Sequence, residues 1–220
     1  MTFRMNFLRT PSGNCFAGND RLFVRSAERN APSIIKLAKS YAPKTGKALE
    51  IASGSGQHVV QLAGVLPGLT WQPSDISNIQ MASINLWIKE ARLANIKPPI
   101  LLDATNPGWS SETCNQDFIL VVNLLHLISF NDTKVMIEEL SKALAFGGRL
   151  MLCGPFMRDG KLTSDGDVHF HQCLRKSNVF LGYKDDVSIL RLLDNFGLIL
   201  VSTEKMPANN LAFVAEKLNE

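Results

Sequence analysis

A chain of 220 residues, 45% of them hydrophobic and 20% charged, is long and apolar enough to bury the core of one α/β domain, which excludes an intrinsically disordered protein. The net charge of +3 comes from 23 basic and 20 acidic residues mixed along the sequence, so the composition gives no support to nucleic-acid binding. No apolar run reaches the length needed to cross a bilayer. This absence predicts that the chain does not associate with a membrane. The four cysteines are scattered without a Cys-x-x-Cys pair, which indicates a reducing, cytoplasmic location.

The first 22 residues are expected to form a flexible N-terminal segment, and residues 23–217 one folded domain. Arg4 and Arg9 precede the first acidic residue, Asp20. This composition resembles that of an organelle import signal, so import is an alternative to the cytoplasmic location.

Strands and helices are predicted to alternate along most of the domain. Helical spacing of apolar residues predicts helices at 59–66, 78–94, 133–145 and 185–196. Short apolar runs predict seven strands, at 48–52, 69–75, 100–104, 118–125, 149–153, 198–203 and 211–215. The last two strands are too close in sequence for a parallel connection, so they should pair antiparallel. The expected fold is therefore α/β, a Rossmann-like doubly wound seven-stranded sheet, mostly parallel with an antiparallel final hairpin strand.

Residues 156–185 fit no strand of this sheet. A connection of about thirty residues inside a compact domain is more often functional than structural. We therefore expect this segment to form a lid or an insertion.

A glycine pair, Gly54 and Gly56, follows the first predicted strand of the sheet. Glycine allows a tight turn and a close approach of backbone to a ligand, and the helix predicted after it offers its amino terminus to a negative group. Asp75 follows Gly56 by 19 residues, near the spacing of about 20 at which a carboxylate accepts hydrogen bonds from ribose hydroxyls. The carboxyl ends of parallel strands share one edge, so these residues predict a ligand of the adenosine type there.

Val59 stands where the dinucleotide-binding fingerprint requires a third small residue, so that the helix can pack closely. Its side chain argues against a nicotinamide cofactor. A nicotinamide-dependent oxidoreductase is nevertheless an alternative function, because the glycine pair and the spaced acid alone do not identify the ligand.

Several segments resemble the methyltransferase-like protein 26 family. They are Ser26-Ala-Glu-Arg-Asn30, Leu49-Glu-Ile-Ala-Ser-Gly-Ser-Gly-Gln-His58, Trp71-Gln-Pro-Ser-Asp75 and Met206-Pro-Ala-Asn-Asn210. The spacing Glu50-x-x-x-Gly54-x-Gly56 is similar to the glycine loop of class I methyltransferases, which have seven strands and an antiparallel last hairpin. The resemblance covers about residues 23–216. It implies an S-adenosylmethionine-dependent methyltransferase with S-adenosyl-L-methionine as its cofactor.

The resemblance also implies roles for single residues. Gly54 and Gly56 would approach the methionine portion of the cofactor, and Glu50 would organise the loop. Asp75 would hold the ribose, and Asp103 would accept a hydrogen bond from the adenine amino group. Either aspartate has an alternative interpretation as the cap of a turn.

Asn123 and His126 follow the fourth predicted strand of the sheet, where the acceptor would meet the methyl group in this fold. Asn123 is expected to contact the cofactor and to take part in catalysis. His126 is a candidate base for the proton of the acceptor, and the alternative is a histidine that only lines the pocket.

Two polar clusters are predicted to bind the acceptor, because both fall in segments that resemble the family. One lies just before a predicted helix and the other between the last two strands; either has the alternative of simple capping or turn chemistry. The residues are Arg25, Glu28, Arg29 and Asn30, followed by Asn209 and Asn210. Arg29 suits a carboxylate or phosphate on the acceptor.

The chain departs from the family's usual pattern at Ala31, where the family has Arg, and over residues 178–185, which indicates that acceptor recognition differs. The resemblance names a reaction class and no acceptor, which is expected to be a small molecule or a protein. A non-catalytic adapter that keeps the fold, and with it the cofactor, is a further alternative.

No metal site is expected. His169 and His171 follow Asp165 and Asp167, a pattern that would share one face of a strand. The segment contains a glycine and is predicted to be loop, so an exposed polar lid is the preferred interpretation.

Overall fold

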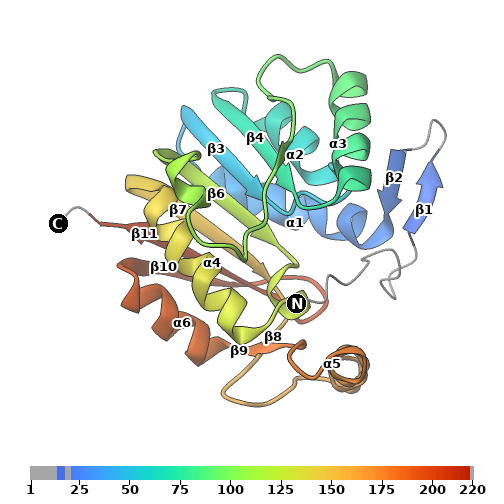
Figure 1. Ribbon diagram of the computed structural model, residues 1–220, viewed down its shortest axis with the longest axis vertical. Coiled ribbons are helices and arrows are strands. Elements are labelled where there is room, and N and C mark those ends of the chain that lie inside the picture. The colour runs from blue at the N-terminus through green and yellow to red at the C-terminus, as the bar shows by residue number, and fades with distance from the viewer. Residues whose placement is uncertain (1–13, 18–20, 219–220) are drawn as a thin grey trace.

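The computed structural model describes residues 14–17 and 21–218, and a central sheet with helices on both faces dominates it (Figure 1). Most of the predicted flexible segment, residues 1–22, lies outside the described residues. In the described part, a strand pair precedes the sheet: β1 (Asn14–Ala17) runs antiparallel to β2 (Arg21–Val24). α1 follows directly at Arg25–Tyr41.

The central sheet has seven strands in the order β10-β11-β7-β6-β3-β4-β5. Its strands are β3 (Gly46–Ile51), β4 (Leu69–Asp75), β5 (Ile100–Leu101), β6 (Gln116–Val122), β7 (Leu144–Gly154), β10 (Leu198–Lys205) and β11 (Leu211–Lys217). β11 runs antiparallel to both of its neighbours, and the pairs on the other side of β7 are parallel. The predicted fold class is therefore confirmed, including the antiparallel final strand.

Helices cover the two faces unequally. One face packs against α1, α2 (Gln57–Val65) and α3 (Asn78–Ala91), and the other packs against α4 (Phe130–Ala143) and α6 (Asp186–Asn195). Successive residues of a strand point to opposite faces. Thus Leu49 and Ile51 lie in the core under α4 and α6, whereas Ala48 lies in the core under α1 and α2.

The connection from β5 to β6 contains only the 3₁₀ turn η1 (Trp109–Ser111). Among the described residues, no α-helix therefore covers β4 and β5 on the side of α4. The chain turns back at this point: β4 and β5 extend the sheet on one side of β3, and β6 and β7 extend it on the other. The carboxyl ends of β3 and β6 thus form the topological switch point, where open α/β sheets bind their ligands.

The prediction of loop structure for residues 165–171 is wrong, because α5 spans Asp165–Ser177. Ser164 caps its amino terminus by accepting a hydrogen bond from the Asp167 amide, and Arg175 and Lys176 stand in its last turn. These are favourable end signals that outweigh one glycine in the first turn. The short parallel strands β8 (Phe156–Met157) and β9 (Lys184–Asp185) join the two ends of this insertion.

Within the described residues, no helix is long and apolar enough to span a membrane. The same part of the chain holds no cluster of three or more His, Cys, Asp or Glu residues that could bind a metal ion. The two histidines considered as metal ligands make separate contacts. His169 contacts Cys173 at 3.5 Å, and His171 accepts a hydrogen bond from the Tyr183 backbone amide at 3.1 Å.

Candidate cofactor and acceptor site

The glycine loop connects β3 to α2 through three residues with positive φ, Ala52 at +53° and the two glycines. Gly54 has φ +59° and Gly56 has φ +95°, in the region that favours glycine. A side chain on Gly56 would place its Cβ 2.9 Å from the Ile84 Cα, so this glycine allows the loop to lie against α3. A Cβ on Gly54 would meet nothing nearer than 4.0 Å. The backbone at Gly54 is therefore open to a ligand.

Asp75 ends β4 beside this loop, as the spacing predicts. One carboxylate oxygen accepts the Gly54 amide at 2.9 Å and the other accepts the Ser77 amide at 3.0 Å. The side chain is buried, and burial raises the pKa of its carboxyl group although backbone hydrogen bonds oppose the shift. Each carboxylate oxygen can accept two hydrogen bonds, and one of these comes from a backbone amide. Each oxygen therefore can still accept a hydrogen bond from a hydroxyl of a ligand.

Glu50 lies one residue before the end of β3 and is 1% exposed. Its Oε2 atom has no hydrogen-bond partner among the described residues. Burial raises the pKa of its carboxyl group to about 8, a hydrogen bond from Ser53 lowers it, and the charge of Asp75 raises it further. A buried, unsatisfied carboxyl group is costly, so Glu50 is a polar group still available to a partner.

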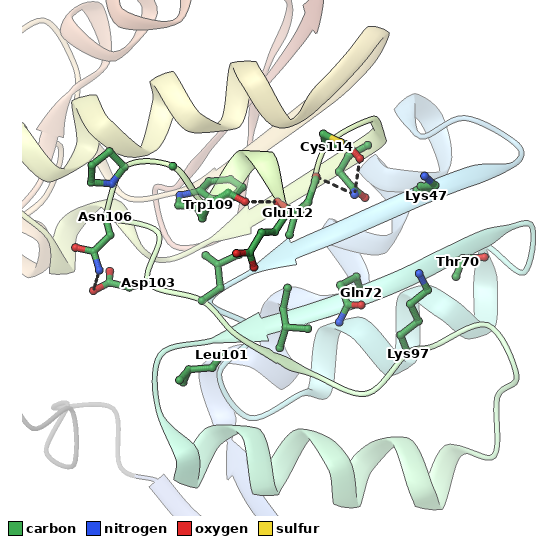
Figure 2. Close-up of a pocket in the computed structure, with 16 residues that line it drawn as sticks. Lys47, Thr70, Gln72, Lys97, Leu101, Asp103, Asn106, Trp109, Glu112 and Cys114 are labelled. Atoms are coloured by element: carbon green, nitrogen blue, oxygen red, sulfur yellow. Dashed lines mark hydrogen bonds between the residues drawn. The ribbon is translucent and has the colours of Figure 1, made fainter.

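Asp103 lies at one end of a groove of about 640 Å³ (Figure 2). The groove runs along the face of β4 that no helix covers, with Thr70, Gln72 and Lys97 towards its other end. The residues of the glycine loop do not line it. Asp103 is tied to its own turn, because its carboxylate accepts the Thr105 amide and hydroxyl at 3.0 and 2.6 Å and the Asn106 side chain at 3.1 Å. The structure thus shows the turn-cap contacts that were the alternative interpretation of this residue. It brings Asp103 near Asp75 through one backbone hydrogen bond, from the Leu102 amide to the Asp75 carbonyl at 3.0 Å.

Asn123 follows β6 with φ +56°, a conformation that is uncommon for a residue with a side chain. Its backbone amide donates to the Cys153 carbonyl of β7 at 2.8 Å, which fixes the residue at the end of β6, beside the switch point. Left-handed backbone at a strand end is a feature of functional turns.

His126 lies in the 3₁₀ turn η2 (Leu125–Leu127), underneath the insertion. Its ring is 5.7 Å from that of Phe170 and 6.3 Å from that of Tyr183, and its Nδ1 atom is buried without a partner among the described residues. Burial, with a contribution from the positive charge of Lys184, lowers the pKa of His126 to about 3. The imidazole is therefore neutral near pH 7 and a weak proton acceptor.

The first polar cluster lies within α1, so the expectation that it precedes a helix is wrong. No side chain caps this helix; it begins at Arg25, directly after β2. Arg25, Glu28 and Arg29 are exposed on its first turns. Asn30 differs, because its Oδ1 atom lies 2.9 Å from His58 Nε2, next to the glycine loop.

The second cluster, in the β10–β11 connection, is tied to the insertion. The side-chain amide of Asn209 donates to the Asp167 carboxylate at 3.2 Å, and the backbone carbonyl of Asn209 accepts from Arg158 at 2.7 Å. The Asn210 amide donates to Pro207, and its carbonyl accepts from Met206, which closes the turn. The β10–β11 connection lies beside the end of β7, since Leu211 pairs with Gly154. It is therefore near Asn123, whose atoms lie 3.8 Å from where a Gly154 Cβ would stand.

Asp167 organises this side of the site, and sequence reasoning missed its role. It is 7% exposed and accepts side-chain hydrogen bonds from four residues, which hold its pKa below the usual value although burial opposes the shift. The donors are Thr163, Ser164, Tyr183 and Asn209. The inward positions of α5, Asp167, Phe170, His171 and Leu174, have the spacing of one helix face, and this pattern is visible in the sequence.

Solved structures with a similar fold are S-adenosylmethionine-dependent methyltransferases and their relatives. A putative O-methyltransferase from Nostoc punctiforme has a TM-score of 0.74 at 15% identity, over 88% of this chain and 58% of that one. The mitomycin 7-O-methyltransferase MmcR has a TM-score of 0.73 at 14% identity, over 87% and 54% of the two chains. The structure of PigF with SAH has a TM-score of 0.72 at 17% identity, over 87% and 56%. At these identities the likeness defines the fold, and the chain spans only 54 to 58% of the length of these proteins.

The chain therefore has the α/β fold of these methyltransferases. It belongs to the family described as "Protein of unknown function (DUF938)", whose family model matches residues 21–217.

Proposed function

We propose that the chain is a methyltransferase that binds S-adenosyl-L-methionine at the carboxyl ends of β3, β4 and β6. The observation that carries the proposal is the hydrogen bond from the Gly54 amide to the Asp75 carboxylate. It joins a glycine turn and an acid from separate strands, which is the arrangement that an adenosine ligand with a charged tail requires.

The residues present fit this cofactor. It carries hydrogen-bond donors at its amino group and ribose hydroxyls, and the buried Glu50 carboxyl group has one oxygen that no described residue satisfies. Gly54 leaves its surroundings open, and Asp75 keeps acceptor capacity for the ribose. Ile76 is 41% exposed directly after Asp75 and offers an apolar surface to the adenine ring. When bound, the cofactor supplies a methyl group on a positively charged sulfur.

Asp103 and Asn123 complete the proposed cofactor side. The Asp103 carboxylate accepts hydrogen bonds from the side chains of Thr105 and Asn106, and the adenine amino group could replace either donor. Asn123 presents a side-chain amide at the switch point from a constrained backbone, so its position is set before any ligand arrives.

The acceptor is proposed to lie on the side of Asn123 that faces the insertion. Asn209 and Asn210 border this side, and Arg25, Glu28 and Arg29 face solvent from α1 with their charges free to meet an acceptor. Asn30 acts through His58. His126 forms the floor beneath Phe170 and Tyr183; its neutral ring is proposed to orient the acceptor, and its low pKa disfavours a role as the base.

Methyl transfer is a displacement in line with the breaking bond, so alignment and exclusion of water supply much of the rate. The insertion covers His126 on this side with the aromatic rings of Phe170 and Tyr183. A small-molecule acceptor suits such a covered site, and the structurally similar MmcR is a methyltransferase of a small molecule, mitomycin. A protein side chain that enters the site is the alternative.

The narrower assignment that we propose is the methyltransferase-like protein 26 family. Its support is the four matching segments, of which the first three meet at one place: His58 contacts Asn30, and Gly54 contacts Asp75. A cytoplasmic location is proposed from the scattered cysteines alone.

Isothermal titration of the purified chain with S-adenosylmethionine, S-adenosylhomocysteine and NADP tests the proposal. We expect binding of the first two and none of NADP, because the fully buried Val59 occupies the position that a dinucleotide fingerprint reserves for a small residue. Binding of NADP alone would favour the oxidoreductase. Cofactor binding without methyl consumption across a metabolite library would favour the adapter.

A further inference from the structure

Ser83 joins the start of the domain to the glycine loop. It is 1% exposed in α3, and its hydroxyl oxygen accepts the Leu22 amide at 2.9 Å. The same hydroxyl donates to the Ser55 carbonyl at 2.8 Å. One buried side chain thus bonds both to β2 and to the loop between Gly54 and Gly56.

Gln57 makes a second connection of the same kind. It is 2% exposed at the start of α2, and its Oε1 atom accepts the Val24 amide at 2.6 Å. That atom also accepts the Ser55 hydroxyl at 2.9 Å. The backbone of β2 is therefore bound by side chains of α2 and α3 that also hold Ser55.

His58 adds a third connection, from the residue after Gln57. Its Nε2 atom lies 2.9 Å from Asn30 Oδ1 and 3.2 Å from the Ala27 carbonyl, and both are acceptors, so Nε2 carries the proton. We call residues 22–30 the docked segment. It carries the exposed Arg25, Glu28 and Arg29 past the loop.

These contacts make the shape of the loop and the position of the docked segment depend on each other. The loop has little freedom to adjust alone, because Gly56 lies against the backbone of α3 beside Ser83. A buried hydroxyl or amide that loses one partner leaves the other unsatisfied, so release of the segment would free Ser55 to move.

We propose that Ser83 and Gln57 are positioning residues of the cofactor site, which couple docking of residues 22–30 to the loop shape that binds the cofactor. The inference rests on the proposed function, since it concerns the same loop. By linkage, the cofactor must then stabilise the docked segment as much as the segment stabilises cofactor binding.

The test uses S-adenosylhomocysteine as the probe and the full chain. Ser83→Ala removes the link, Ser83→Thr keeps a hydroxyl there, and Ser141→Ala is the matched control. Ser141 is also a buried serine that donates to a backbone carbonyl, that of Phe196 at 2.6 Å, but it lies between α4 and the end of α6.

We expect Ser83→Ala to weaken probe affinity by at least about fivefold in isothermal titration, while Ser83→Thr and Ser141→Ala stay within about twofold of wild type. Hydrogen exchange at the Leu22 and Val24 amides should slow when the probe binds the wild type, and Ser83→Ala should reduce this protection. Gln57→Met, which keeps the side-chain length but removes the acceptor, should have the same effect and serves if Ser83→Ala does not fold.

Equal probe affinity of the wild type and the link-removing variants would overturn the coupling, as would exchange at Leu22 and Val24 that does not respond to the probe. If the wild type itself does not bind the probe, the proposed function fails first. The two failures are therefore distinguishable.

Discussion

Replacing Asp75 with alanine tests the cofactor site most directly. In the structure its carboxylate accepts one backbone amide on each oxygen, from Gly54 and Ser77. The remaining acceptor sites are those proposed to take the ribose hydroxyls. Asp75→Ala removes these acceptors and the contact that ties the glycine loop to β4.

A hydrogen bond to a charged group contributes about 1.5 to 3 kcal/mol, which corresponds to a loss of affinity of about ten- to 150-fold. We take this as the expected increase in the dissociation constant of S-adenosylhomocysteine, measured by isothermal titration near pH 7. Burial raises the pKa of Asp75, so its carboxyl group takes up a proton at a higher pH than that of an exposed aspartate. The loss should therefore become smaller as the pH is lowered, because the protonated wild-type side chain is a weaker acceptor.

Asp117→Ala is the matched control. Asp117 also accepts a hydrogen bond from the backbone amide of a neighbouring strand, that of Lys47 at 2.7 Å, but it lies at the amino-terminal ends of the strands, away from the glycine loop. The Asp117→Ala variant should have lower thermal stability but an unchanged affinity for S-adenosylhomocysteine. Unchanged affinity of the Asp75→Ala protein would refute the reasoning and remove Asp75 from the site.

Three further changes test other parts of the site. The folded Glu50 carboxyl group has a pKa of about 8 against about 4.5 when unfolded, so the folded state holds more protons between these values and stability falls as pH rises from 4.5 to 8, by an amount on the order of 4 kcal/mol. Thermal unfolding at pH 5 to 8 should therefore depend less on pH in Glu50→Gln, and an identical dependence in both proteins would contradict the assignment. Gly56→Ala should destabilise the chain by about 1 to 3 kcal/mol, because its Cβ would meet the Ile84 backbone at positive φ; denaturant unfolding that shows no loss would argue against this loop geometry. Asp167→Leu should leave the Asn209 amide without its acceptor and speed proteolysis within α5, whereas a cleavage rate equal to that of wild type would show that this contact does not hold the insertion.

The sheet was predictable because its inner strands, such as β3, β6 and β7, are largely buried on both faces and because turns separate the strands. β4 matches its predicted range of residues 69–75, and the apolar run that forms β6 is almost continuous. β5 is only two residues long, shorter than predicted, because it pairs with the end of β4 and has no second neighbour among the described strands. α5 was missed because only Phe170 and Leu174 of its inward positions are apolar, so the helical spacing of apolar residues is weak there although the positions themselves follow one helix face.

The cofactor side was partly predictable, because residues that end parallel strands share one edge of the sheet. The contact between Gly54 and Asp75 follows from that rule. The burial and the low pKa of His126 could not be predicted from the sequence, because they depend on Phe170 and Tyr183 from the insertion. Ser83 gave no signal, because a serine within an amphipathic helix looks like any other surface residue until its partners are known.

The amino-acid sequence by itself determined the order of the seven sheet strands and of the helices between them apart from α5, the antiparallel last strand, and the acids and glycines that end β3 and β4. These features depend on local periodicity and on the rules of chain connection. Only the tertiary structure decided which polar groups are buried, which of them meet, and therefore which are ionised. Burial and hydrogen bonding depend on residues distant in sequence, as between Leu22, Ser83 and Ser55, and no local pattern encodes such contacts.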